Sequence, residues 1–200
     1  MCEVKIEKLD NQGRGICYVN NKITFVENAL PNEQVIIRLT KESKKFNEAE
    51  VLEYIVTSED RVLSPCPYFN ECGGCELLNL SYENTCNYKK EKLENILSKY
   101  ANIKTKVEIV KCKNHLNYRN KITLKVENGK YGYYASKTHK LIEVDKCLLA
   151  EPAINNFIQD IDKLNIKTGE VTIRSNYNSE LLIWIKSQSK VKPNISYLKS

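Results

Sequence analysis

The alternation of apolar and polar residues over the first 57 positions predicts short β-strands separated by turns. CEVKIEKL alternates, and GICYV and KITFV are joined by Asn20-Asn21, a pair that tolerates the positive φ of a tight hairpin. QVIIRLT and AEVLEYIV are two further strand candidates. Because so short a segment cannot fill a two-layer sandwich, the pattern predicts a small closed barrel without free sheet edges.

The pattern changes after the polar, proline-containing connection TSEDRVLSPCP. Apolar residues at helical spacing predict a helix over 82–100 with Ser81 as its N-cap. A second helix is predicted over AEPAINNFIQDIDKL, with Pro152 in its first turn. The remaining strand candidates are KVEIVKC, NKITLKVE, YGYYA, KLIEV and a terminal hairpin of GEVTIRSN with ELLIWIKS. The sequence therefore predicts a mainly β member of the α+β class, with an OB-like barrel at 1–57 and an α+β domain at 58–200.

Composition and charge narrow the functional classes. The apolar runs fall far short of a membrane span, and the N-terminus lacks the apolar core of a signal peptide, so we expect a cytoplasmic protein without a membrane partner. Residues 86–147 hold 15 Lys and Arg against 6 Asp and Glu, whereas residues 1–60 hold 8 against 11. A localised basic excess suits a polyanion partner, although a Lys-rich solvated surface is the alternative.

Three cysteines, Cys66, Cys72 and Cys75, stand close together in CPYFNECGGC. In a reducing compartment this spacing indicates metal ligands rather than disulfides. Structural zinc usually takes two Cys-x2-Cys hairpins, whereas an iron–sulfur cubane accepts three ligands from one loop and a distant fourth. This chain has one such hairpin, which favours the cubane and leaves zinc as the alternative.

The fourth ligand has three candidates. Cys86 lies on the apolar stripe of the first predicted helix, and Cys112 follows a predicted strand without turn residues. Cys147 lies at a strand-to-helix connection, where a ligand can point freely, and is the favoured choice. Cys2 and Cys17, within the predicted barrel, are interpreted as packing residues.

These segments together resemble the bacterial (uracil-5-)-methyltransferases, S-adenosylmethionine-dependent enzymes that form 5-methyluridine in ribosomal RNA. The resemblance covers CPYFNECGGCELLNLSYE, YRNKITLKV, GYYASKTHKLIEVDKC and an N-terminal stretch similar to a TRAM domain. It implies a [4Fe–4S] cluster on Cys66, Cys72, Cys75 and Cys147. Two positions depart from the family pattern: Asn32 replaces the usual glycine of its turn, and Cys86 replaces a larger apolar residue.

The RNA-binding candidates are Tyr118, Arg119, Asn120 and Lys121, followed by Tyr133 and His139 among further tyrosines and lysines. Aromatic rings among cations are typical of single-stranded RNA recognition, and the alternative is that the tyrosines pack a sheet. For His139 a structural hydrogen bond is an equal alternative.

The family's catalytic machinery is not found in these 200 residues. There is no strand–GxGxxG–helix pattern for S-adenosylmethionine, no Rossmann-like domain, and no cysteine in the nucleophile's motif, so no catalytic residue is assigned. We expect an RNA-binding, cluster-bearing N-terminal portion, inactive alone, whose first helix would dock on a separate methyltransferase domain. The alternatives are a stand-alone RNA-binding or redox-sensing adaptor and a zinc-stabilised binding protein.

Overall fold

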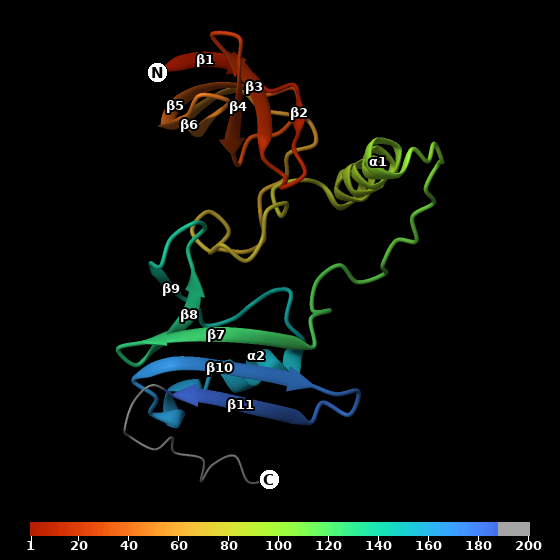
Figure 1. Cartoon of the computed structure of the whole chain (residues 1–200). Helices are drawn as coiled ribbons and strands as arrows, with labels where there is room; N and C mark the ends of the chain where they lie inside the picture. Colours follow the sequence, from red (N-terminus) through yellow and green to blue (C-terminus); the bar gives the residue numbers. More distant parts are fainter. Residues whose placement is uncertain (188–200) are drawn as a thin grey trace. The chain divides into compact units, whose positions relative to one another are not determined.

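The computed structural model describes residues 1–187, which divide into two compact units (Figure 1). The N-terminal unit comprises Met1–Pro65 and Glu76–Lys111, and the second unit comprises Cys66–Cys75 and the chain from Cys112 onward. The cysteine loop thus belongs to the second unit, although the residues on both sides of it belong to the first. None of the helices in the described part of the chain is long and apolar enough to cross a membrane.

The N-terminal unit is built on a six-stranded sheet. Its strands are β1 (Cys2–Lys5), β2 (Lys8–Leu9), β3 (Gly15–Val19), β4 (Lys22–Glu27), β5 (Gln34–Glu42) and β6 (Asn47–Val56). The order β1-β5-β6-β4-β3-β2 ends at β1 and β2, so the sheet is a half-barrel rather than the closed barrel predicted. The two-residue β2 is too short to pair along β1 and close it. Asn20 and Asn21 have positive φ, which confirms the predicted hairpin, and Asn32 likewise adopts the left-handed conformation.

The concave side of this sheet holds the N-terminal core. Ile6, Val26, Val35 and Ile37 are fully buried there, and Cys17 lies among them. Cys2 packs against the same cluster. Both cysteines therefore have the packing role that the sequence predicted.

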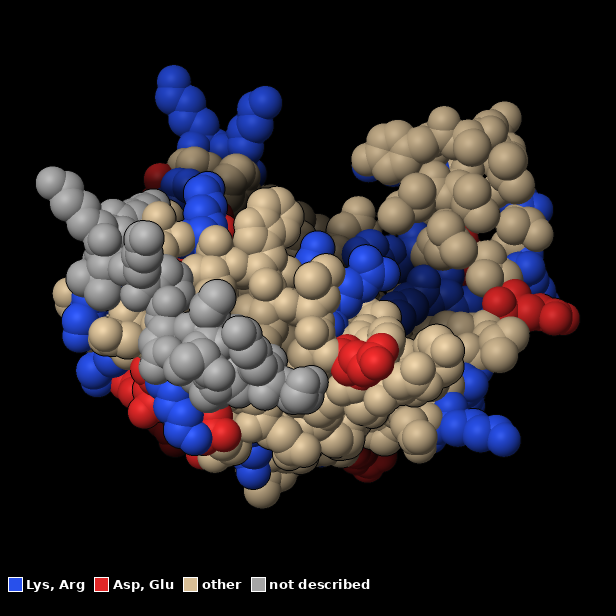
Figure 2. All heavy atoms as spheres, turned by 90° about the horizontal axis from the view of Figure 1, so that it is seen from below, with Lys and Arg blue, Asp and Glu red and all other residues tan. Residues whose placement is uncertain are grey.

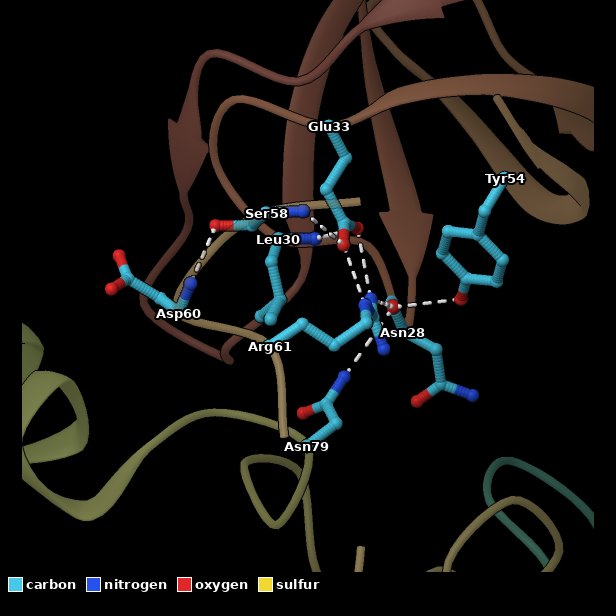
Figure 3. A network of polar contacts seen from close by, with 8 residues as sticks. All are labelled: Asn28, Leu30, Glu33, Tyr54, Ser58, Asp60, Arg61 and Asn79. Carbon is cyan, nitrogen blue, oxygen red and sulfur yellow. Dashed lines mark hydrogen bonds and ion pairs between the residues drawn. The ribbon is translucent and has the colours of Figure 1, made fainter. Parts of the chain in front are cut away.

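A buried ion pair fixes the end of the half-barrel to the connection that follows it (Figure 3). Arg61 Nε lies 2.5 Å from Glu33 Oε1, and the Glu33 side chain is completely buried. The other guanidinium donor reaches the carbonyl of Asn28 at 2.6 Å, and Tyr54 donates to the same carbonyl at 3.0 Å. Glu33 also accepts the backbone N–H groups of Leu30 and Ser58, so its lone pairs are satisfied by four donors.

Helix α1 (Tyr82–Ala101) forms as predicted, with Ser81 accepting the N–H of Asn84 at its N-cap. Cys86 is its one buried residue within the described chain, which confirms the packing role predicted for that thiol. The sequence assigned this helix to the domain at 58–200, but it groups with the half-barrel. Tyr88 donates to the carbonyl of Asp10 and Lys92 to that of Asn11, and these bonds hold α1 to the turn between β2 and β3.

The second unit contains a five-stranded antiparallel sheet in the order β11-β10-β7-β8-β9. Its strands are β7 (Lys121–Glu127), β8 (Lys130–Tyr134), β9 (Leu141–Glu143), β10 (Thr168–Ser175) and β11 (Leu181–Ser187). Helix α2 (Pro152–Ile158) and the 3-10 turn η1 (Ile161–Leu164) lie against one face, behind the sheet in Figure 1. The core between them is formed by alternate strand residues and by apolar residues of α2 and η1: Ile122, Leu124, Val171, Ile173, Ile154, Ile158 and Leu164.

Two expectations about regular structure were wrong. KVEIVKC forms no strand, because its polar groups bond to α1: Glu94 accepts the N–H of Val107, and Lys111 pairs with Glu83. The second predicted helix is also interrupted, and η1 follows α2 after a short break at Gln159–Asp160.

Candidate cysteine metal centre

The loop Cys66–Cys75 is organised by its own backbone hydrogen bonds. The N–H of Phe69 reaches the carbonyl of Cys66 at 3.2 Å, and the N–H of Cys72 reaches that of Tyr68 at 2.7 Å. These bonds fold the residues between the first two cysteines into consecutive tight turns. The spacing C-x5-C is therefore compact in space as well as in sequence.

The loop docks on the end of β8 at Cys72 and Gly73. Cys72 forms an antiparallel bridge with Ala135, and the N–H of Gly73 donates to the carbonyl of Tyr134 at 3.0 Å. A Cβ atom on Gly73 would lie 2.8 Å from that oxygen and 2.9 Å from the Ser136 nitrogen, both backbone atoms. The first glycine of CGGC is therefore required for a close backbone approach.

The distant cysteine is held beside this loop by side chains that the sequence reading did not single out. Asn155, on α2, accepts the N–H of Cys147 at 2.8 Å and donates to its carbonyl at 3.0 Å. Tyr68, in the loop, donates to Asp145 Oδ1 at 2.7 Å. These hydrogen bonds connect the cysteine loop to the Cys147 segment, although the two are more than seventy positions apart in sequence. The residues that make the connection lie next to the cysteines in each segment.

The four thiols interact electrostatically. Burial raises the pKa of Cys75 to about 12; the Arg119 guanidinium opposes this, and the Cys147, Cys72 and Cys66 thiols add to it. Burial likewise raises the pKa of Cys72, with Cys66 and Cys147 among the further causes. The four cysteines expected as ligands are thus close enough to affect the pKa of Cys75 or Cys72, and their role as metal ligands stays a prediction. Within residues 1–187, however, no three His, Cys, Asp or Glu side chains are arranged to hold a single metal ion.

The other two candidates for the fourth position lie outside this group. Cys86 is buried in α1 of the N-terminal unit. Cys112 is exposed, and its thiol donates to the carbonyl of Asn114 at 3.0 Å. Neither contributes to the pKa shifts of Cys72 or Cys75.

The surroundings of the four thiols fit a sulfur-rich, negatively charged group. The Tyr133 hydroxyl is buried, and no oxygen or nitrogen atom in the described part of the chain accepts its proton. Burial raises the pKa of Tyr133, and the thiols of Cys147 and Cys72 raise it further, so this O–H lies beside these two thiols. A buried donor beside two of the four cysteines is a position from which a hydrogen bond to sulfur could be made. Arg119 adds a positive charge on the same side.

The six RNA-binding candidates are placed differently from one another. Tyr118, Asn120, Lys121 and His139 are exposed. Arg119 is half-buried, its backbone pairs with Leu149 and Glu151, and its charge acts on Cys75 and Cys147. The hydroxyl of Tyr133 points inward rather than to solvent.

The tyrosines near the RNA-binding candidates also differ in their surroundings. Tyr131 is a core residue whose hydroxyl accepts the N–H of Ile166, so for this ring the sheet-packing alternative is the one found. His139 packs edge-on against Tyr134, with ring centroids 5.3 Å apart. The sequence reading missed Tyr68, Asp145 and Asn155, and the only signal for them was their closeness to the cysteines.

The chain is similar to known RNA methyltransferases and to a known domain model. Residues 1–52 match the model of the TRAM domain. An "Uncharacterized RNA methyltransferase" of Aquifex aeolicus is 34% identical over 164 residues, which is 80% of this chain and 38% of that protein. The 23S rRNA (uracil(1939)-C(5))-methyltransferase RlmD of Vibrio parahaemolyticus is 28% identical over 164 residues, covering 79% of this chain and 37% of that protein.

A solved structure shows the same fold. The tRNA (uracil-54, C5)-methyltransferase of Pyrococcus abyssi, in complex with S-adenosyl-L-homocysteine, superposes with a TM-score of 0.77 at 20% identity, over 99% of this chain and 49% of that one. The chain thus spans less than half the length of each of these proteins. With a TRAM domain at its start, the chain is homologous along most of its length to RNA methyltransferases, among them (uracil-5-) enzymes.

Proposed function

We propose that this chain is the RNA-binding, [4Fe–4S]-carrying N-terminal portion of an rRNA (uracil-5-)-methyltransferase. The observation that supports this proposal best is the hydrogen bond from Tyr68 to Asp145, which connects the Cys66–Cys75 loop to the Cys147 segment. In this proposal the methyl donor and the catalytic groups belong to sequence outside these 200 residues. The protein acts in the cytoplasm, where thiols stay reduced.

The spacing of the cysteines in the sequence supports a polynuclear cluster better than zinc. Structural zinc usually takes two Cys-x2-Cys hairpins. A cubane takes one thiolate on each iron and accepts three ligands from one loop and a distant fourth. This chain has one Cys-x2-Cys hairpin, formed by Cys72 and Cys75, with Cys66 on the same loop and Cys147 far away in sequence.

The cysteine loop and the Cys147 segment are each positioned by other residues of the chain. Gly73 admits the loop to the end of β8, Asn155 fixes the backbone of Cys147, and Tyr68 joins the two segments. Arg119 supplies positive charge beside the thiolates. When bound, the cluster would form a rigid covalent crosslink between the loop and Cys147, and it could also exchange electrons.

The cluster proposal is tested by comparing two single-cysteine variants. After anaerobic purification and reconstitution, we expect about four irons and four sulfides per chain. Cys147→Ala should lose most of this iron, whereas the matched control Cys112→Ala should retain it, because Cys112 is exposed and does not affect the pKa of Cys72 or Cys75. Full iron content in Cys147→Ala would exclude that residue as a ligand. A colourless protein containing one zinc would instead support the zinc-stabilised alternative.

The RNA proposal rests on the family relationship and on the exposed cations and rings at the start of β7. We expect binding to undermodified 23S rRNA fragments that weakens with salt, because phosphate contacts release counterions. Labelled S-adenosylmethionine should transfer no methyl group to that RNA with this chain alone. Incorporation above background would show that the catalytic groups lie within these 200 residues.

A further inference from the structure

The sheet of the second unit has one face covered by α2 and η1, and among residues 112–187 no helix covers the opposite face. Residues of β7, β10 and β11 alternate between them, and those directed to α2 and η1 form the core. The opposite residues form what we call the open face, and no helix lies in front of it in Figure 1. Its members are Lys121, Thr123, Lys125, Glu170, Thr172, Arg174, Leu182, Trp184 and Lys186.

The open face exposes two large apolar side chains on its edge strand. Trp184 is 73% exposed and Leu182 is 69% exposed. In the ladder Trp184 lies opposite Thr172, and Leu182 lies opposite Arg174. Trp184 is highly exposed and lies opposite only a small hydroxyl residue, so its indole ring is accessible for stacking.

The polar part of the open face is predominantly cationic. Lys125 is paired with Glu170, and the hydroxyls of Thr123 and Thr172 bond to each other between the strands. Lys121 and Arg174 lie opposite each other in the ladder, and Lys186 lies opposite Glu170, whose pKa Lys125 lowers most and Lys186 lowers further. Figure 2, which views the molecule from below rather than onto the open face, shows more Lys and Arg than Asp and Glu on that side.

We propose that the open face is a binding surface for single-stranded RNA, in which an unpaired base stacks on Trp184 while Arg174, Lys121 and Lys186 contact the adjacent phosphates. Aromatic platforms bordered by cations are what unpaired RNA requires, because every base has a ring face and every linkage a negative charge. A second copy of the chain is disfavoured as occupant, since a cationic face would meet the same cations across a twofold axis. Lys121 also belongs to the YRNK segment, so the open face continues those candidates along β7. This inference extends the proposed RNA binding to a defined surface and does not depend on the cluster.

Trp184 gives the test its readout, because it is the only tryptophan of the chain. The full chain is titrated with a single-stranded RNA of about 12 nucleotides, within the span that such surfaces cover. Tryptophan emission is recorded together with the anisotropy of a labelled copy of that RNA. We expect RNA to quench the emission along the same curve as the anisotropy. The same RNA as a duplex should quench little.

Three variants sharpen the result. Trp184→Ala should bind at least ~5-fold more weakly by anisotropy, the loss expected for one stacked base. Arg174→Ala should reduce the salt slope by about 0.7, the value for one phosphate contact on a single strand. Lys163→Ala, which removes an exposed cation from η1 on the covered side, should leave both quantities unchanged.

The failures are distinguishable. If anisotropy shows RNA binding but tryptophan emission does not change and Trp184→Ala binds with normal affinity, the open face is not the binding surface, although the chain still binds RNA. Equal quenching by the duplex would overturn the preference for single strands. A concentration-dependent emission shift without RNA, accompanied by dimers in sedimentation, would assign the face to a second copy. Absence of any RNA binding would refute both this inference and the RNA-binding part of the proposed function.

Discussion

Replacing Arg61 by Ala should selectively destabilise the N-terminal unit. The change leaves the Glu33 carboxylate, which is completely buried, with only the N–H groups of Leu30 and Ser58 as donors. Breaking a buried ion pair from one side typically costs about 3–5 kcal/mol, because the remaining charge stays desolvated. Since Glu33 keeps two of its four donors and Arg61 is itself 20% exposed, we expect about 3 kcal/mol, the lower end of that range.

The matched control is Arg38→Ala. Arg38 pairs with Glu50 on the same sheet, at 2.6 Å from Nε to Oε1, but both side chains are exposed. Exposed pairs contribute about 0–1 kcal/mol, since solvent screens them and ordering two long side chains opposes them. The two variants therefore remove the same residue type from the same unit and differ mainly in burial.

Hydrogen exchange with mass spectrometry measures the effect on each unit of the intact chain. Peptides from β5 and β6 should exchange roughly 100-fold faster in Arg61→Ala, because about 3 kcal/mol corresponds to two powers of ten in the opening equilibrium. Peptides from β10 and β11 serve as internal reference and should not change. Equal effects of Arg61→Ala and Arg38→Ala would refute the assignment of stability to burial of the Glu33 charge.

Three further outcomes are expected. Gly73→Ala should release the cysteine loop and lower the iron retained after reconstitution several-fold, because its Cβ would collide with the backbone at Tyr134 and Ser136. Gly74→Ala should retain iron, because its Cβ meets only the Cys72 sulfur, at 3.4 Å, and equal losses in the two variants would contradict the docking of the loop at Gly73. Arg119→Ala should weaken both iron retention and RNA binding, because the Arg119 charge lies beside the thiols, whereas Lys121→Ala should weaken only RNA binding. Iron content and RNA affinity are measured on the same preparations, and unchanged iron content in Arg119→Ala would mean that Arg119 contributes to RNA binding only. Burial raises the pKa of Cys17 from 9.0 to about 11, so the stability contributed by the neutral thiol is complete below pH 9 and is lost as the pH rises through 11. Between pH 8 and pH 11 the free energy of unfolding in urea should therefore fall less in Cys17→Val than in the unmodified chain, and equal decreases would contradict this role of Cys17.

The local elements were predictable from the sequence where local energetics decide them. The strand alternation, the Asn20-Asn21 hairpin and the Ser81 cap each depend on a few neighbouring residues, and each was found. The four candidate ligands were chosen from spacing, turn residues and family resemblance, and their role stays a prediction. Cys17 and Cys86 could be set aside, because both lie in apolar patterns and both are buried.

What only the tertiary structure decided is where these pieces meet. KVEIVKC has the composition of a strand, but a strand needs a partner, and its polar groups bond to α1 instead. Arg119 follows an exposed tyrosine in sequence, yet chain pairing with the residues after Cys147 turns it toward the thiols. Trp184 alternates with core residues in an apolar run, and only the position of α2 determines which set stays exposed. Local pattern fixes backbone conformation through short-range sterics and hydrogen bonds, whereas burial and charge environment depend on contacts between segments far apart in the chain.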